Sequence, residues 1–278
     1  MPPVLILGCG YVGTRVAERL LERGERVIAT SREPAALGVL ARLGAEIVGL
    51  EARDGGALAV LREATLEPGL RVLLSIPPAT GASGPGEAAA VLSACGCPPS
   101  RVVYLSSTSV YGRAGLVDER TVPAPADAHG EARLRAEGEA ATGPWPTLVL
   151  RAAAIYGPGR GLHVAMRTGA QPRVDDVDRV VSRVHVDDLA SLCLAALASD
   201  LAGAFPVADE EPASTREVAR FCEGLGLPRL RGVSGPVAPR GWPGRRVDGR
   251  AVFARLGVTL RHPSFRSGVP DALAAGAA

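Results

Sequence analysis

The prediction of a fold starts from VLILGCGYVGTRVAERLLERGERVIA, residues 4–29. This stretch opens with an apolar run at 4–7 that ends at Gly8, a pattern that indicates a buried strand. Apolar residues then recur at helical spacing as far as Gly24, and a second apolar run follows at 27–29. The stretch therefore predicts a strand, a glycine turn, a helix and a second strand.

The same alternation continues along the first half of the chain. Further strands are predicted at 46–50, 71–76, 101–107 and 147–151, and further helices at 55–64, 87–94 and 130–141. Near-continuous apolar strands that alternate with helices are typical of a parallel sheet covered on both faces. We predict an α/β fold: a doubly wound, Rossmann-type parallel sheet over residues 1–152 and a small C-terminal substrate-binding part over residues 153–278.

The regularity weakens beyond residue 152. A helix is predicted at 189–198, and another begins at Ser214, which forms a capping-box pattern with Glu217. We expect the segment around 180–208 to return to the main sheet. Residues 228–250 are rich in Pro, Gly and Arg without periodicity, and they are predicted to form a loop.

The composition is that of an ordinary globular chain. The 278 residues carry 31 basic and 29 acidic side chains, and this net charge of +2 is too small to indicate a nucleic-acid partner. All of the basic residues are Arg, so the lack of a Lys at any one position is weak evidence about function. The chain shows no long apolar run and no charged leader, so we expect neither a membrane partner nor a signal peptide.

The five cysteines are odd in number and scattered along the chain. We expect them to be reduced thiols in a cytoplasmic protein. The pair Cys95 and Cys97 lacks the second pair of ligands that would indicate a zinc site, so no metal is expected.

Three glycines, Gly8, Gly10 and Gly13, form the pattern GxGxxG between the first strand and its helix. In this setting the pattern predicts a dinucleotide site, although three glycines could also form a turn without a ligand. The first permits a tight turn, the second lets the backbone approach a pyrophosphate, and the third lets helix and strand pack closely. Tyr11 and Val12 begin the helix, whose N–H groups would face the phosphates. Ser75, near the end of the predicted strand 71–76, is assigned to the same site.

The end of the second strand bears on the choice of dinucleotide. It reads Thr30-Ser31-Arg32, with no acid before Glu33 to bind a ribose 2′-OH. We predict that Ser31 and Arg32 bind a 2′-phosphate, which favours NADP over NAD. The alternative is that Arg32 is one more solvated residue in a chain rich in Arg.

Five segments, in the right order, resemble motifs of the NAD-dependent epimerase/dehydratase branch of the short-chain dehydrogenase/reductase superfamily. They are YLSSTSVYG (104–112), VDERTVPAP (117–125), LRAAAIYGPGR (150–160), RVHVDDLASLCLAAL (183–197) and PVADEEPASTREVA (206–219). The GxGxxG spacing and the short length resemble the atypical group within that superfamily, whose members often have altered catalytic residues.

The resemblance implies a catalytic set of a hydroxyl, a Tyr and a Lys. Ser107 falls on the hydroxyl position, with Thr108 beside it as a substitute. The family pattern YGxSKxxAE aligns with HGEARLRAE, so that His129 stands where the Tyr would be and Arg133 where the Lys would be. One helical turn separates these two residues, and they are expected on the same face. Arg133 is expected to bind ribose hydroxyls.

His129 has two interpretations. Its imidazole would transfer protons near neutral pH, or it is a helix-start residue without a catalytic role. Tyr111 and Tyr156 are expected to line the pocket rather than to donate protons.

Other polar residues of these motifs are interpreted more simply. His185, Asp187 and Asp188 are predicted to begin a helix, where acids are favoured. The sequence indicates no residue that would pair with His163. Arg160 is predicted to be solvated, with binding of an anionic substrate as the alternative.

The resemblance implies an NAD(P)-dependent oxidoreductase. We expect it to transfer a hydride at a hydroxyl or carbonyl carbon of a small, sugar-like substrate. Two alternatives stay open: a non-catalytic NADP-binding sensor or scaffold, and a reductase whose proton comes from the substrate. A homodimer is left open as well.

Overall fold

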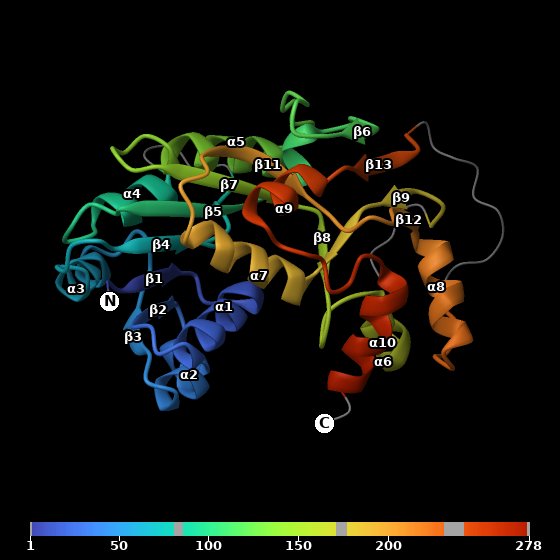
Figure 1. The fold of residues 1–278 in the computed structure, drawn as a ribbon, viewed down its shortest axis with the longest axis horizontal. Helices are drawn as coiled ribbons and strands as arrows, with labels where there is room; N and C mark the ends of the chain where they lie inside the picture. Colours follow the sequence, from blue (N-terminus) through green and yellow to red (C-terminus); the bar gives the residue numbers. More distant parts are fainter. Residues whose placement is uncertain (1, 81–85, 171–176, 231–241, 277–278) are drawn as a thin grey trace.

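The computed structural model describes residues 2–80, 86–170, 177–230 and 242–276. A seven-stranded parallel sheet crosses the larger part of the molecule, with helices on both of its faces (Figure 1). Its strand order is β11-β7-β5-β4-β1-β2-β3, which confirms the predicted doubly wound, Rossmann-type fold. The strands are β1 (Val4–Leu7), β2 (Val27–Ser31), β3 (Glu46–Gly49), β4 (Arg71–Leu74), β5 (Arg101–Ser107), β7 (Thr147–Ala152) and β11 (Gly203–Val207).

The helices that cover the sheet form two layers. One layer consists of α1 (Tyr11–Glu22), α2 (Gly38–Arg42), α7 (Val186–Leu197) and α9 (Arg250–Leu256), and the other of α3 (Gly55–Ala64), α4 (Glu87–Ser93) and α5 (Ala128–Ala140). Strand β1 contributes to both cores, because successive side chains of a strand point to opposite faces. Ile6 belongs to the core under α1 and α7, whereas Leu5 and Leu7 belong to the core under α3, α4 and α5.

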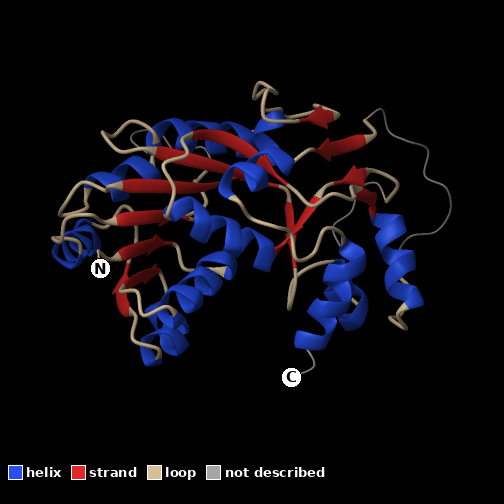
Figure 2. Cartoon of the chain, in the orientation of Figure 1, coloured by secondary structure: helices blue, strands red, loops and turns tan. Residues whose placement is uncertain are grey.

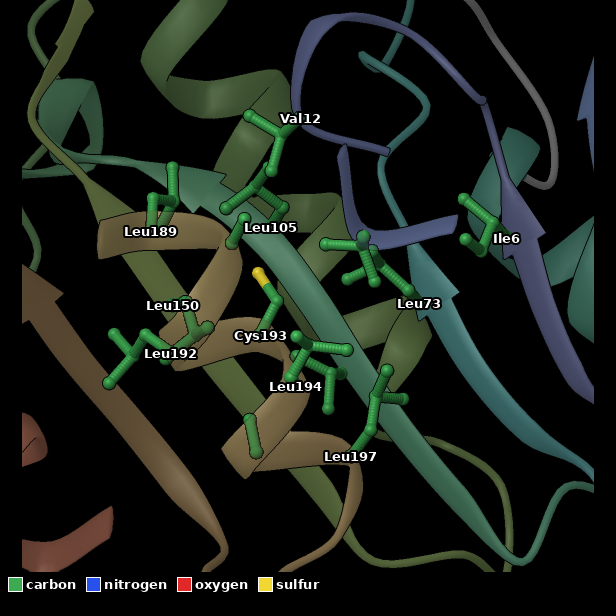
Figure 3. Packing of buried hydrophobic residues seen from close by; sticks show 14 of the residues in the cluster. Ile6, Val12, Leu73, Leu105, Leu150, Leu189, Leu192, Cys193, Leu194 and Leu197 are labelled. Atoms are coloured by element: carbon green, nitrogen blue, oxygen red, sulfur yellow. The ribbon is translucent and has the colours of Figure 1, made fainter. Parts of the chain in front are cut away.

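Figure 3 shows the first of these cores. Leu189 and Cys193 of α7 lie against Leu105 of β5 and Val12 of α1, and the described side chains there are almost fully buried. Because β1 and β4, in the middle of the sheet, place apolar side chains on both faces, the sheet must be covered twice. This explains why the sequence shows near-continuous apolar runs rather than alternation.

Most predicted elements are present with small shifts of their ends. The strand β5 and the helix α3 have the predicted bounds, whereas β4 ends two residues early at Leu74 and α7 begins three residues early at Val186. The turn η1 (Pro34–Leu37) and the helix α2, which follow β2, were not predicted. They are short and mostly exposed, so they lack the apolar periodicity that identifies a longer helix.

The prediction of a loop over 228–250 is wrong in part. The strand β13 (Gly244–Val247) pairs in parallel with β6 (Leu116–Val117) and β9 (Val180–Val181), and β9 also pairs with β12 (Ala213–Ser214). Residues 231–241 of the predicted loop lie outside the described residues. The sequence of β13, GRRV, has no alternation, and the partners that make it a strand are far away in the chain.

A second group of elements lies beyond the carboxyl ends of the strands of the main sheet (Figure 2). The helices α6 (Leu162–Thr168), α8 (Thr215–Gly224) and α10 (Phe265–Ala275) share a small apolar core that includes Met166, Cys222 and Phe265. The strands β8 (Ala154–Tyr156) and β10 (Arg183–His185) pair in parallel and connect this group to the sheet. Across the described helices, none is both long and apolar enough to cross a membrane.

Candidate functional site

A cavity of about 1010 Å³ opens at the carboxyl ends of the central strands. The cavity is lined by residues that follow β1, β2 and β4, by residues at the end of β5 and by residues of the C-terminal elements. The strand order reverses between β1 and β4, and this is the place where doubly wound sheets bind ligands. Ten residues predicted for the site line this cavity: Gly8, Gly10, Tyr11, Val12, Ser31, Arg32, Ser75, Ser107, Thr108 and Arg133.

The glycine turn has the shape that the pattern requires. Gly8 has a φ of +85°, and a Cβ there would lie 3.0 Å from the backbone nitrogen of Ile76. Gly13 does not line the cavity; a Cβ there would lie 3.0 Å from both the carbonyl oxygen of Gly8 and Cγ2 of Ile6. The third glycine therefore allows α1 to pack closely on β1. A Cβ on Gly10 would meet no described atom within 4 Å, which leaves room beside the turn for a ligand.

The start of α1 is open to an anion. Its N-cap residue is Gly10, and no side chain that the structure describes caps the helix. Such a helix end has unpaired N–H groups and a positive end of the helix dipole. The cradle formed by Gly8, Gly10 and α1 therefore fits the pyrophosphate of a dinucleotide.

The end of β2 presents a cation to the cavity. Arg32 is exposed, lines the cavity and makes no ion pair with any residue that the structure describes. Ser31 accepts a hydrogen bond from the N–H of Glu33 at 3.0 Å, and Glu33 is not part of the described cavity wall. The nearest acid in the sequence is thus absent from the described cavity wall, whereas Arg32 is part of it.

Two hydroxyls lie where β5 ends. Ser107 accepts a hydrogen bond from the N–H of Ser109 at 3.2 Å, and Thr108 begins the turn η2 (Thr108–Tyr111). Arg133 of α5 lies across the same strand end, because its Nη1 donates to the carbonyl oxygen of Leu105 at 3.2 Å. The structure therefore brings Ser107, Thr108 and Arg133 to one wall of the cavity.

The structure does not bring His129 to this wall. Its side chain is exposed, and it is absent from the described cavity lining. His129 and Arg133 share a helix, but one turn places His129 about 6 Å nearer to the start of α5. The four-residue spacing predicts that His129 and Arg133 share one face of the helix. It does not predict where the start of the helix lies relative to the cavity.

A buried charged network supports the wall from behind, and the sequence analysis missed it. Arg151 of β7 donates from Nη2 to Glu137 Oε2 at 2.7 Å and from Nη1 to the hydroxyl of Tyr111 at 3.0 Å. Ser106, which lines the cavity, donates to Glu137 Oε1 at 2.6 Å. An arginine inside an otherwise apolar strand was the available signal, because a buried charge needs a partner.

The two tyrosines expected in the pocket lie elsewhere. Tyr111 is buried and hydrogen-bonded to Arg151, and burial raises its pKa despite that bond. Tyr156 packs in the C-terminal core, where its ring meets His185 at 5.2 Å between centroids. Neither ring is part of the described cavity wall.

The C-terminal elements give the cavity a cationic side. Arg160, Arg179 and Arg245 line it together with Trp242. The guanidinium carbons of Arg179 and Arg245 lie 5.5 Å and 5.6 Å from a Trp242 ring centroid. Arg245 also donates to the carbonyl oxygen of Gly112, which ties it to the turn after β5. Of these four residues only Arg160 was considered from the sequence, because the others lie in segments without a recognised motif.

Comparison with known proteins adds the family. The model of the NAD dependent epimerase/dehydratase family matches residues 4–207. The chain belongs to this family. Membership in the epimerase/dehydratase family confirms the predicted enzyme class, which works with a nicotinamide dinucleotide.

Two relatives of this epimerase/dehydratase family member are a reductase with a named substrate and a protein of unknown function. A 3-diazoavenalumate denitrifying reductase from Streptomyces sp is 33% identical over 138 residues, which cover 44% of this chain and 45% of that protein. The chain thus matches less than half of the length of this curated relative. A conserved protein of unknown function from Silicibacter pomeroyi DSS is 29% identical with a TM-score of 0.76, and the match covers 99% of both chains.

A third comparison shows the fold alone. MoeE5 in complex with UDP-glucose and NAD is 23% identical with a TM-score of 0.78, and the match covers 98% of this chain and 97% of that one.

Proposed function

We propose that this chain is an NADP-dependent oxidoreductase that transfers a hydride at a hydroxyl or carbonyl carbon of a small, sugar-like, anionic substrate. One observation carries the proposal. A single cavity joins the glycine turn, the hydroxyls at the end of β5 and three arginines of the C-terminal elements. Family membership favours this enzyme over the alternative of a non-catalytic sensor.

The cofactor would be held by the residues on the sheet side of the cavity. The turn at Gly8 and Gly10 and the uncapped start of α1 would bind the pyrophosphate. Arg32 would pair with the 2′-phosphate, and Arg133 would donate to ribose hydroxyls. When bound, the nicotinamide supplies hydride exchange with the substrate carbon.

Ser107 and Thr108 would orient the substrate oxygen. The Ser107 hydroxyl oxygen already accepts the N–H of Ser109, so its own proton is free to be donated. A hydroxyl held at a strand end by a backbone contact loses little entropy when the substrate binds.

The proton would come from water or from the substrate rather than from His129. No histidine lines the part of the cavity that the structure describes, and His129 is exposed. Burial raises the pKa of Cys9 to about 11, and burial likewise raises the pKa of Tyr11, so neither is a base near pH 7. The geometry favours the reductase alternative, and a denitrifying reductase among the relatives is consistent with it.

The substrate would bind on the cationic side. Arg160, Arg179 and Arg245 all lie beyond residue 152, which supports the proposed substrate-binding role of residues 153–278. Guanidinium groups pair with carboxylate or phosphate, and a nucleoside diphosphate sugar carries phosphate. UDP-glucose is bound by the related fold of MoeE5, and we extend that substrate class to this chain as a proposal.

The test is a screen of NADPH oxidation and NADP reduction with sugar phosphates, sugar nucleotides and aromatic carboxylates. With a turned-over substrate, Ser107→Ala should lower kcat, whereas Arg245→Gln should raise KM about tenfold or more. Arg42→Gln, on the exposed side of α2 away from the cavity, is the matched control and should change neither. An Arg245→Gln enzyme with the parental KM would contradict the anionic substrate.

Two further expectations stay predictions. The cytoplasm is the expected location, because five free cysteines suit a reducing compartment. The oligomeric state, for which a homodimer was left open, can be measured by sedimentation or light scattering.

A further inference from the structure

Two histidines and two aspartates meet outside the described cavity wall. His185 and Asp187 come from the junction of β10 and α7, His262 precedes α10, and Asp271 lies on α10. One ligand atom from each residue can be chosen so that all four lie within 4.8 Å of one another. The imidazole centroids of His185 and His262 are 4.1 Å apart.

Three of the four imidazole nitrogens in this cluster lack hydrogen-bond partners among the described residues. His185 is fully buried and His262 is 4% exposed. Both nitrogens of His262 and Nε2 of His185 have no hydrogen-bond partner among the described residues. His185 Nδ1 accepts one long hydrogen bond, 3.3 Å, from the N–H of Asp187. Buried polar atoms without partners are unfavourable, so a water molecule or an ion between these nitrogens would stabilise the cluster.

The carboxylates are held so that one oxygen of each faces a histidine. Arg19 donates to Asp187 Oδ1 at 2.9 Å, and Arg261 donates to Asp271 Oδ1 at 2.9 Å. The other oxygen, Oδ2, lies 3.7 Å from His185 Nδ1 in the first case and 3.7 Å from His262 Nε2 in the second. These distances are too long for hydrogen bonds. Carboxylates that bind a metal are oriented in this way by outer hydrogen bonds.

We propose that His185, Asp187, His262 and Asp271 form a binding site for one divalent transition-metal ion, with Zn²⁺ as the best match. Two imidazole nitrogens and two carboxylate oxygens provide the four ligands that a structural zinc site takes. Ligands about 2.0 Å from a tetrahedral ion are roughly 3.3 Å apart, so the cluster would contract by about 1.5 Å or less on binding.

The charges are compatible with a cation. The two carboxylates attract a dication, although each of them is already paired with arginine. Arg15, Arg19 and Arg261 lie close by and reduce the affinity, so we expect weaker binding than at a site without arginines.

A metal here would join two parts of the molecule. His185 and Asp187 belong to the layer that covers the sheet, whereas His262 and Asp271 belong to the segment of α10, which packs over Tyr156. With four protein ligands and no open position, the site is structural rather than catalytic. Bound Zn²⁺ should therefore raise the stability of the native chain.

The test is a titration of chelator-treated full chain with Co²⁺ alone, followed by absorption in the visible range, and then displacement by Zn²⁺. We expect one Co²⁺ per chain with the bands of a tetrahedral ion and no sulfur-to-cobalt charge transfer. His262→Gln should weaken Zn²⁺ binding by at least about 100-fold. Zn²⁺ at about 100 times its Kd should raise the Tm of the parent by roughly 5–10 °C and leave that of His262→Gln unchanged.

Two matched histidine variants serve as controls. His129→Gln removes an exposed imidazole, and His163→Gln removes a buried one whose Nε2 has no described partner. Both should bind Zn²⁺ as the parent does. Asp271→Asn, at a half-buried position, replaces His262→Gln if that variant does not fold. The proposal is overturned if the parent binds no Co²⁺, if a thiolate band appears, or if both cluster variants bind Zn²⁺ like the parent.

Discussion

Arg32 lies at the end of β2, beside the predicted position of the adenosine ribose. It is exposed, lines the cavity and makes no ion pair with the described residues. A charge-assisted hydrogen bond, such as one from Arg32 to a 2′-phosphate, contributes about 1.5–3 kcal/mol to binding. We therefore predict that Arg32→Ala weakens NADP binding by roughly 10- to 100-fold and changes NAD binding little.

Calorimetry with both cofactors measures this difference. Arg42→Ala, on α2 and outside the described wall of the cavity, is the control and should change neither affinity. Equal losses for the two cofactors would show that Arg32 does not contact a 2′-phosphate.

His129 illustrates how a position in an alignment can differ from a position in space. Because its side chain is exposed and apart from the cavity, we predict that His129→Phe keeps kcat within about threefold of the parent. A positioned general acid or base contributes about two to four decades of rate, so the two interpretations differ clearly. Steady-state kinetics on the substrate from the screen measure the effect, with Ser107→Ala as the variant that should lose rate. A loss of two decades in His129→Phe would mean that α5 moves His129 into the cavity.

Among the elements, the contact between α1 and β1 depends on Gly13. A Cβ there would already lie 3.0 Å from Gly8 O and Ile6 Cγ2, and Gly13→Val adds two more carbons. We predict that this change separates α1 from β1, lowers the free energy of unfolding by about 1–3 kcal/mol and abolishes dinucleotide binding.

Gly10→Ala is the informative partner of that variant. A Cβ on Gly10 meets no described atom, yet the residue lines the cavity. We expect Gly10→Ala to keep the parental stability in urea unfolding and to weaken the dinucleotide. Full affinity in both variants would mean that the glycine turn does not bind a cofactor.

The elements α5, β5 and β7 are also connected by charge. Glu137, Arg151 and Ser106 link the helix to two central strands through hydrogen bonds of 2.6–3.2 Å. This network lies directly behind the end of β5, where Ser107 and Thr108 face the cavity. Removal of either partner would leave an uncompensated buried charge, so both residues are needed to keep this network intact.

A buried acid at the junction between the main sheet and the C-terminal elements affects the stability of the whole molecule. Asp209 follows β11 and is 2% exposed, and its carboxyl oxygens have no side-chain hydrogen-bond partner among the described residues. Burial raises the pKa of Asp209 from 3.8 to about 8, although Arg183 opposes the shift. The folded chain keeps this proton over a range where the unfolded chain has lost it. The free energy of unfolding should therefore fall as the pH rises from about 4 to about 8.

We predict that Asp209→Asn removes this part of the pH dependence. At pH 8 the variant should be more stable than the parent by at least about 1 kcal/mol, and the difference should vanish near pH 4. Urea unfolding at several pH values in the presence of a chelator measures it. Glu63→Gln, an exposed change on α3, should leave the parental slope intact. An Asp209→Asn protein that is less stable than the parent at pH 8 would mean that Asp209 is ionised and paired.

Local pattern was enough to predict the main sheet, the glycine turn and ten of the residues that line the cavity. Apolar runs and helical spacing act over a few residues, and parallel strands place their carboxyl ends together, so Gly8, Ser75 and Ser107 had to meet. The positions of other residues depend on contacts across the chain. The strand β13, the Glu137–Arg151 pair, the arginines around Trp242 and the cluster from His185 to Asp271 each join segments that no local period relates. The position of His129 also depends on contacts across the chain. The packing of the whole helix α5 determines whether its first turn is exposed, and the four-residue spacing from His129 to Arg133 does not.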